Sequence, residues 1–487
     1  MSRSPMPIAP QSPRPARFLT GDLMRHIIVM SLSASVGLVA LFVVDFVDLY
    51  FISMLGDTAL TAAVGFAGTL MAFGLSVSIG LMIAMSALGA RRIGAGDEAG
   101  ARALATSVLT LGSLVGVAFA AVFWIFAPQL LALLGASGDA QSAAVRYLRI
   151  VMPAMPVMAF AMICSGLLRA HGDARRAMNV TLFSALANAV LDPILIFGFG
   201  LGLDGAAWAS VLARLTMCAT AAIPILRHYG GFAPFRTPQV VAHIRPIVGI
   251  AAPAILTNLA TPVGIVFVTR AIAAYGDAAV AGYSVLARLM PLAFCVIFAL
   301  SGAVGPIVGQ NFGASQFTRV RETIIKSIQF TAIYTAIMWA MLLVGQGFIA
   351  DQFSISGVGR EIIFWFAAVA APLLVFNGIL FVCNAVLNNL DRPLWSTYLN
   401  WGRNTLGVIP FVILGSQVYG APGVVIGQYA GGIVFAALGL WLSLWLVDHF
   451  ARHHREGGRA DGAAPVNQPA SAAISAKVQN PSVSVES

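Results

Sequence analysis

Residues 44–56, VDFVDLYFISMLG, place two carboxylates, Asp45 and Asp48, inside an apolar run that is long enough to cross a lipid bilayer. Ionisable side chains at membrane depth are costly, and those that occur there usually have a function. A second polar pair lies in NAVLDPILIFGFG, where Asn188 and Asp192 are one helical turn apart and share a helix face. We expect these segments to meet in one polar site, which the rest of the chain holds together.

The composition is that of a membrane protein. Hydrophobic residues make up 59% of the chain and charged residues 10%, whereas roughly a quarter of an ordinary soluble domain is charged. The formal charge of +9 comes from basic residues scattered between apolar runs, which favours a role in membrane topology over nucleic-acid binding. The cysteines lie in apolar spans without metal-ligand spacing and are interpreted as core residues: Cys164, Cys218, Cys295 and Cys383.

Apolar runs of bilayer-spanning length recur along the chain and predict an all-α polytopic protein with twelve transmembrane helices. The first run is too long for a signal peptide and has no cleavage site, so we expect it to be retained. The polar segments 1–20 and 451–487 are predicted to be disordered tails. The twelve helices are expected near residues 27–54, 58–88, 104–127, 144–168, 178–200, 205–226, 244–274, 279–307, 323–348, 361–388, 395–416 and 421–447.

The distribution of basic residues predicts the orientation. Most of the 28 Lys and Arg residues lie in the termini and in the loops that follow the even-numbered helices. Because such loops stay on the cytoplasmic side, both termini are predicted to be cytoplasmic, in a plasma membrane that we expect to be a bacterial inner membrane. On this topology the first and fifth helices run in the same direction, which allows Asp48 and Asp192 to lie at similar depth.

The chain contains an internal repeat. The segment that starts LGDTALTAAVG at Leu55 aligns with the segment that starts YGDAAVAGYSV at Tyr275. This predicts two pseudo-symmetric six-helix bundles, at residues 21–230 and 231–450, with a cleft between them. Six helices per bundle give both bundles the same orientation, as in transporters that work by alternating access.

The repeat is broken at the two buried acids. Asp48 falls opposite Val268, and Asp192 falls near Pro410, so neither acid has a counterpart in the second bundle. An acid that served the fold alone would be expected in both bundles. We therefore predict one cation-coupling site, in the N-terminal bundle.

The chemistry of this site leaves the coupling ion open. A carboxylate at the bilayer centre costs roughly 2.5 to 3.5 kcal/mol unless it is paired, solvated or protonated. Oxygen ligands from Asp48, Asp192 and Asn188, with the carbonyl of Ala189 that Pro193 leaves without a donor, would suit a sodium ion. Uptake of a proton by either acid needs no such ligand set.

The segments FVDLYFISMLGDTALTAAVG, NAVLDPILIFGFG and PIVGQNFGAS, in this order, resemble those of the multidrug and toxic compound extrusion (MATE) transporters. The resemblance extends over residues 20 to 450. It implies two bundles around a V-shaped cleft, and antiport of H+ or Na+ against small lipophilic, often cationic, compounds. By position, Asp48 matches the family's acid in the first helix, and Asn188 and Asp192 match its pair in the fifth.

The resemblance also implies secondary positions. Tyr147 is a looser match to a tyrosine in the fourth helix, and Ser210 lies where some members have a hydroxyl in the sixth. Another branch of the family has a glutamate in helix 7 and an aspartate in helix 10. Here helix 7 has no acid and helix 10 has Asn377 and Asn384, which favours the N-terminal site.

Other candidates have a functional and a structural interpretation. Asp45 shares roughly the face of Asp48, but it could simply bond to backbone. Gln310 and Asn311 more plausibly end helix 8 than bind a ligand. Methionine, aromatic and polar side chains in the spans could form an adaptable substrate surface or pack against lipid and core, with Met155, Phe160, Phe376, Asn377 and Arg288 as the substrate-binding candidates.

Several function classes lack their motifs. The pattern GxGxxG at residues 200–205 joins two predicted spans and is not read as a dinucleotide fingerprint, and neither a phosphate-binding loop nor HExxH is present. We therefore expect neither an enzyme nor a cofactor nor an obligate protein partner. Two alternatives stay open. A lipid-linked oligosaccharide flippase would need a cationic cavity, for which the facing helices offer chiefly Arg270 and Arg288, and a channel or receptor would not need a duplication with acids on one side.

Overall fold

The computed structural model describes residues 16–460, and within this range all regular secondary structure is helical. The first half contains α1 (Leu23–Ser53), α2 (Thr58–Gly94), α3 (Glu98–Ile125), α4 (Ala127–Leu133), α5 (Gly138–Val151), η1 (Met152–Ala154), α6 (Met155–Ala170), α7 (Ala174–Pro193), η2 (Ile194–Gly198) and α8 (Gly202–His228). The second half contains α9 (Thr237–Ala273), α10 (Asp277–Ala293), α11 (Cys295–Gly313), α12 (Phe317–Gln352), α13 (Gly357–Trp365), η3 (Phe366–Ala370), α14 (Ala371–Asn389), α15 (Pro393–Asn404), α16 (Ile409–Ala430) and α17 (Gly432–Ala460).

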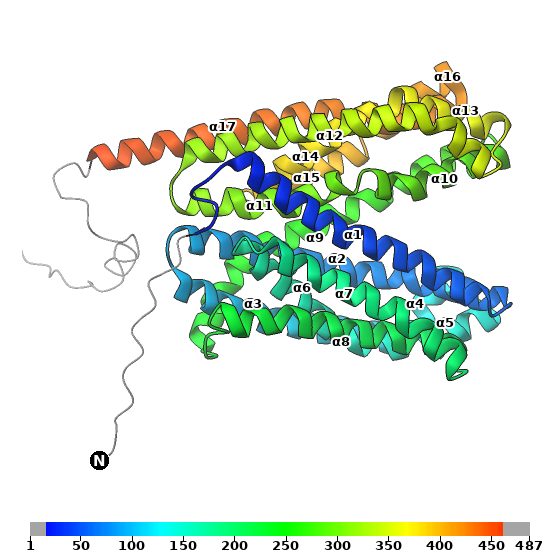
Figure 1. Ribbon diagram of the computed structural model, residues 1–487, viewed down its shortest axis with the longest axis horizontal. Helices are drawn as coiled ribbons and strands as arrows, with labels where there is room; N and C mark the ends of the chain where they lie inside the picture. Colours follow the sequence, from blue (N-terminus) through cyan, green and yellow to red (C-terminus); the bar gives the residue numbers. More distant parts are fainter. Residues whose placement is uncertain (1–15, 461–487) are drawn as a thin grey trace, which may run out of the picture.

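The helices run along one common direction in two groups (Figure 1). Helices α2–α8 gather on one side and α12–α17 on the other, and α1, α9 and α11 lie between them. Helix α1 packs on both α7 and α11, while α2 packs on both α11 and α9. The start of α1 and the end of α17 lie at the same end of the molecule, which we call the terminal end. The division into bundles at residues 21–230 and 231–450 stays a prediction, because α1, α9 and α11 pack on helices of both halves.

The helices confirm the predicted all-α membrane fold. Eleven helical stretches in the described range are long and apolar enough to span a membrane. The last of them, Pro393–His454, has 62 residues, which at about 1.5 Å per residue is roughly three bilayer cores long. It reverses direction at Gly420, where φ is +63°. The reversal makes two antiparallel spans and gives twelve in all, as predicted.

Glycines pair across this reversal. A Cβ at Gly431 would overlap the carbonyl group of Gly407, and a Cβ at Gly415 or at Gly423 would overlap the carbonyl group of the other. Such small-residue contacts are a common way for membrane helices to approach closely. The final two spans therefore form a tight hairpin.

The predicted tails are partly wrong. Phe18 is 1% exposed and its N–H donates to Gln310 Oε1 at 2.9 Å, because the terminal end of α11 offers it an apolar pocket and a polar partner. At the other terminus, α17 continues the apolar span as helix to Ala460, so residues 451–460 belong to a helix. The remaining parts of both predicted tails, residues 1–15 and 461–487, lie outside the described residues.

Two contacts between α2 and α11 close the terminal end between the halves. A Cβ at Gly94 would overlap the backbone of Gln310, and a Cβ at Gly313 would overlap that of Arg91. The internal repeat aligns Arg91 with Gln310 and Gly94 with Gly313, so the two contacts are one contact repeated by the pseudo-twofold axis. The axis therefore passes between α2 and α11.

Gln310 and Asn311 strengthen this closure. Both lie in the last turns of α11, as predicted, and both are fully buried. Gln310 Nε2 donates to the carbonyl of Ala170 in α6 at 2.7 Å, and Asn311 Nδ2 donates to the carbonyls of Ile307 at 2.8 Å and Phe18 at 3.3 Å. Beyond ending a helix, the pair joins the two halves and the N-terminal segment.

Candidate functional site

The two acidic segments of the first half meet. Asn188 Nδ2 donates to both carboxylate oxygens of Asp48, at 2.8 and 2.9 Å, and to Asp192 Oδ2 at 3.1 Å. The side chains of Asp48 and Asp192 also interact directly. One amide thus links two carboxyl groups from α1 and α7, and the three residues form what we call the acidic cluster.

Local sequence sets this geometry. Asn188 and Asp192 are four residues apart in α7, so both project toward α1. Gly37 lets α1 approach α7, because a Cβ there would overlap Thr181. Pro193 ends α7 and cannot donate a helical hydrogen bond, and the backbone then widens into the π-helical turn η2, where Phe199 N–H donates to the carbonyl of Ile194 at 2.9 Å. The acidic cluster therefore lies beside an irregular turn.

The cluster is buried and carries no basic partner. Asp192 is 1% exposed and Asn188 6% exposed, and Asp48 is partly buried. None of the ion pairs in the described part of the chain includes either acid. Two adjacent carboxylates cannot both stay charged in a dry site, so the arrangement favours a shared proton or an enclosed cation.

Tyr147 and Ser210 lie next to the acidic cluster, without a direct hydrogen bond to it. Tyr147 in α5 is buried, and its Oη lies 3.4 Å from Ser210 Oγ in α8. The buried Arg214 on the same helix donates to the carbonyl of Val151 at 2.9 Å and interacts electrostatically with Tyr147. Tyr147 therefore interacts electrostatically with both acids and with a buried guanidinium group.

Asp45 is not part of the cluster. Its side chain is exposed on α1, and none of the described hydrogen bonds or ion pairs includes it. It interacts with Asp48 through space alone. Three residues of separation turn a helical side chain by about 60°, and this rotation is enough to point Asp45 away from α7.

The predicted substrate-binding residues do not gather in one cavity. Met155 is 3% exposed, with its methyl group against Gly74. Phe160 packs edge-on against Phe232, with ring centroids 6.2 Å apart. In the second half, Phe376 is partly buried and Asn377 buried on α14, whereas Arg288 is exposed on α10, so the five residues are distributed over both halves: Met155, Phe160, Phe376, Asn377 and Arg288.

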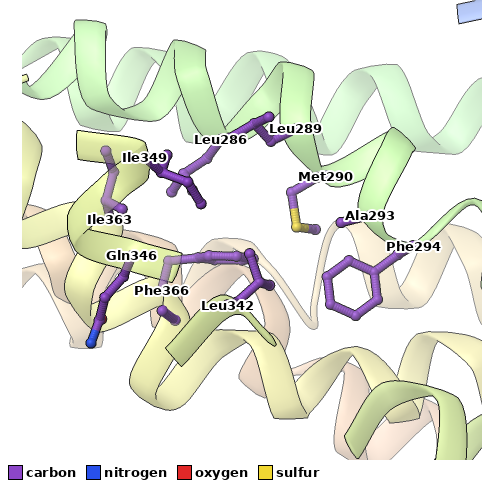
Figure 2. Close-up of a pocket in the computed structure, with 11 residues that line it drawn as sticks. Leu286, Leu289, Met290, Ala293, Phe294, Leu342, Gln346, Ile349, Ile363 and Phe366 are labelled. Carbon is purple, nitrogen blue, oxygen red and sulfur yellow. The ribbon is translucent and has the colours of Figure 1, made fainter. Parts of the chain in front are cut away.

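Two other cavities stand out. One is apolar and lies within the second half, where Leu286, Met290 and Phe366 converge (Figure 2). The other lies between the halves and is lined by residues of α2, α6, α11 and α14. The sequence interpretation missed both. For the second cavity a signal existed, since the repeat aligns LLRAHGDARRAM with AVLNNLDRPLWS and so brings Arg169 to the place equivalent to Leu387, next to Asn388 and Asn389.

Twelve membrane-spanning helices in two repeated halves, with a buried pair of acids, define a membrane transporter of the secondary type. The MatE family model matches residues 34–194 and 253–414, once in each half. The chain belongs to this family, the multidrug and toxic compound extrusion transporters, as its three sequence segments predicted.

Known relatives agree with this assignment. The chain is 28% identical over 414 residues to the FAD transporter of Shewanella oneidensis, covering 84% of this chain and 91% of the relative. It is 25% identical over 435 residues to the multidrug export protein MepA of Staphylococcus haemolyticus, covering 87% and 94%. Among solved structures, a mutant of the MATE transporter VcmN of Vibrio cholerae has a TM-score of 0.82 and 25% identity, covering 87% of this chain and 96% of that one.

Proposed function

We propose that this transporter is a cation-coupled antiporter, in which a proton or sodium ion bound at the acidic cluster drives export of a small lipophilic compound. The observation that carries the proposal is the link from Asn188 to Asp48 and Asp192 at 2.8 to 3.1 Å, in a buried site with no basic partner. Such a site readily binds a proton or a cation. It occurs in the first half alone.

The orientation of Asn188 favours the proton. Its amide nitrogen faces three of the four carboxylate oxygens, so the cluster has a donor when no metal is bound. A sodium ion would need the amide to turn its oxygen toward the acids. A proton shared by Asp48 and Asp192 needs no rearrangement, and Tyr147 with Ser210 would extend the polar path beyond the acids.

Coupling would act through the turn beside the cluster. Binding of an ion at Asp192 changes the charge next to Pro193 and η2, where the helix is already irregular. A shift there moves α7 against α1, which also packs on α11 in the other half. With both termini on the cytoplasmic side of a bacterial inner membrane, the closed terminal end would make this the outward-facing state.

The test is transport in proteoliposomes. Uptake of a fluorescent lipophilic cation is measured under an imposed proton gradient and, separately, a sodium gradient, for wild type, Asp48→Asn and Asp192→Asn. Asp351→Asn is the control, because that carboxylate pairs with Arg360 at the surface. Either cluster variant should abolish gradient-driven uptake while the control keeps it, and the effective gradient identifies the ion. Wild-type uptake in both cluster variants would refute the proposal and favour a lipid flippase.

An anionic cargo is the second candidate. The Shewanella relative is named a FAD transporter, and FAD carries a negatively charged diphosphate. In the second half of this chain Arg270, Arg288 and Arg403 lie inside the spans, whereas most of its described acids lie near helix ends. Replacing the lipophilic cation by FAD tests this candidate in the same uptake assay.

A further inference from the structure

The cavity between the halves lies on the pseudo-twofold axis. Its volume is about 20 Å³, which is room for one small group in this closed arrangement. The residues that line it come from two helices of each half: Met82, Ile83, Ser86 and Ala87 of α2, Arg169 of α6, Ser301, Gly302 and Gly305 of α11, and Ala385, Asn388 and Asn389 of α14. The repeat aligns α2 with α11 and the end of α6 with the end of α14, so equivalent segments face each other across the cavity.

The symmetry is broken by one charge. Arg169 comes from the first half, and near the equivalent place in the second half stand the neutral Asn388 and Asn389. Gly302 makes room for the guanidinium group, because a Cβ there would overlap Arg169 Nη1. The positive charge in the cavity thus comes from the first half only.

Arg169 has no counter-charge. Among the described residues it takes part in no ion pair and in no hydrogen bond, and its Nε is buried without an acceptor. No Asp or Glu lines the cavity. The next acid along the chain, Asp391 just after α14, is already paired with Arg91. Since a guanidinium group removed from water is costly unless it is paired, an anion in the cavity would stabilise Arg169.

The facing amides are also incompletely satisfied. Asn388 is 4% exposed and Asn389 2% exposed, and the Oδ1 atom of each is buried without a donor. Asn389 Nδ2 donates to the carbonyl of Ala385 at 2.8 Å, while Arg91 Nη2 donates to the backbone carbonyl of Asn388 at 3.1 Å and fixes its position. The side-chain amide of Asn388, which lines the cavity, thus keeps hydrogen-bonding capacity for a ligand.

We propose that this cavity binds a carboxylate or phosphate anion, held by the Arg169 guanidinium group with N–H and O–H donors from Asn388, Ser86 and Ser301. The proposal rests on the antiporter function above and assigns the second of its two candidate cargoes: an organic anion whose charged group lies on Arg169 and whose apolar body lies beside Met82 and Ile83 once the terminal end opens. A free inorganic anion offers the same chemistry to the site, and the experiment separates the two sources. A guanidinium group suits such ligands because it donates two parallel hydrogen bonds.

The site is near the closure at the terminal end. Ser86 lies five residues before Arg91 in α2, and Gly305 lies five residues before Gln310 in α11, so the cavity is about one and a half helical turns from the contacts that seal this end. When these contacts separate, the cavity opens toward the terminal side. An anion would then reach Arg169 from the cytoplasm and leave toward the opposite side once the closure has formed again.

The experiment measures equilibrium binding to the purified full-length transporter in nanodiscs. Two probes share an apolar body and differ in charge: pyrenebutyrate and pyrenebutyl-trimethylammonium. Inorganic phosphate and chloride are then added as competitors. The proteins are wild type, Arg169→Gln, Arg169→Lys and Arg321→Gln, the last as a control because Arg321 pairs with Asp448 at the surface.

We expect pyrenebutyrate to bind wild type and Arg321→Gln equally, to bind Arg169→Gln about tenfold or more weakly, and to bind Arg169→Lys with intermediate affinity. If phosphate and chloride displace pyrenebutyrate only at high concentration, the site is assigned to an organic anion. If they displace it strongly from wild type, and this competition is lost in Arg169→Gln, the site is assigned to a free inorganic anion. Absence of anion binding, or equal binding by Arg169→Gln, would overturn the proposal and leave water as the occupant.

Asp48→Asn separates this result from the coupling proposal. If that variant binds pyrenebutyrate like wild type but loses gradient-driven transport, both proposals hold. If it binds and also transports normally, the coupling proposal fails while the anion site stands.

Discussion

Asn188 Nδ2 donates to both carboxylate oxygens of Asp48, across the contact between α1 and α7. A single amide therefore controls how close two helices hold two acids. We expect Asn188→Ala to lower the free energy of unfolding by about 1.5 to 3 kcal/mol, because both acids lose their donor. Thermal unfolding in detergent measures the loss.

The matched control for this change is Asn258→Ala. Asn258 donates only to the carbonyl of Ala254 in its own helix, at 2.8 Å, so its loss should cost about 1 kcal/mol or less. An equal loss in both variants would contradict a special role for the Asn188 bridge.

The closure at the terminal end should respond to one methyl group. Gly313→Ala inserts a Cβ against the backbone of Arg91, so the two halves should separate there and the inward-open population should rise. Spin labels on Ala95→Cys and Ala314→Cys, with the native cysteines replaced by serine, report the distance between α2 and α11. Gly345→Ala, with no neighbour within 4 Å, is the control and should leave the distance distribution unchanged.

The hairpin of the last two spans should depend on Gly420. Its φ of +63° is unfavourable for any residue with a Cβ, so Gly420→Ala should destabilise the protein by about 1 to 2 kcal/mol. Gly249→Ala, inside α9 with no neighbour within 4 Å, should instead stabilise it by up to about 1 kcal/mol. Opposite signs in thermal unfolding are the expected result, and equal signs would count against a strained turn.

A pH-dependent contact lies outside the spans, at Asp173. Burial raises the pKa of this carboxyl group, but hydrogen bonds from Tyr229 Oη at 2.7 Å and from Arg176 outweigh burial and lower the pKa below its usual value. Because the folded pKa is lowered, the stabilisation is present above the ordinary pKa of about 3.9 and is lost as pH falls through the folded value.

Tyr229→Phe should therefore lower stability by about 1.5 to 3 kcal/mol at neutral pH, where the carboxylate loses a donor. The gap to wild type should narrow below pH 4, when Asp173 becomes protonated in both proteins. Unfolding measured at several pH values checks this trend. A gap that stays constant down to the lowest pH would mean that the tyrosine acts through packing alone.

The sequence allowed the fold and the acidic cluster to be predicted for simple reasons. The length of the apolar runs predicted the membrane spans, and the internal repeat predicted two halves. The four-residue spacing of Asn188 and Asp192 predicted that they share one helix face. The substrate-binding predictions had no such support, because apolar side chains such as Met155 and Phe160 look the same whether they face core, lipid or cleft. Only the packing separates these environments.

Contacts distant in sequence were the hardest to foresee. Phe18 is buried because of Gln310, 292 residues away, and its polar surroundings in the chain suggested a disordered tail. Predicting the Arg169 cavity required the position of the pseudo-twofold axis. Equivalent residues of the repeat face each other there because the axis passes between α2 and α11. Asp45 and Asp48 looked alike in the sequence, but their side chains point in different directions around the axis of α1, and only Asp48 reaches Asn188.

The contacts of Gly94 and Gly313 have a further consequence. Both partners at these two contacts present main chain, so the contacts themselves can part and form again without a change of side-chain rotamer. The side chains that cross the closure beside them, such as Gln310 to the carbonyl of Ala170, are the groups that must release. The main-chain surfaces at the two contacts fit each other directly, so their separation is controlled by the side chains that surround them. Little of the free energy of each transport cycle is then needed to form the contacts of Gly94 and Gly313 again, and most of it is available for moving the cargo and the ion.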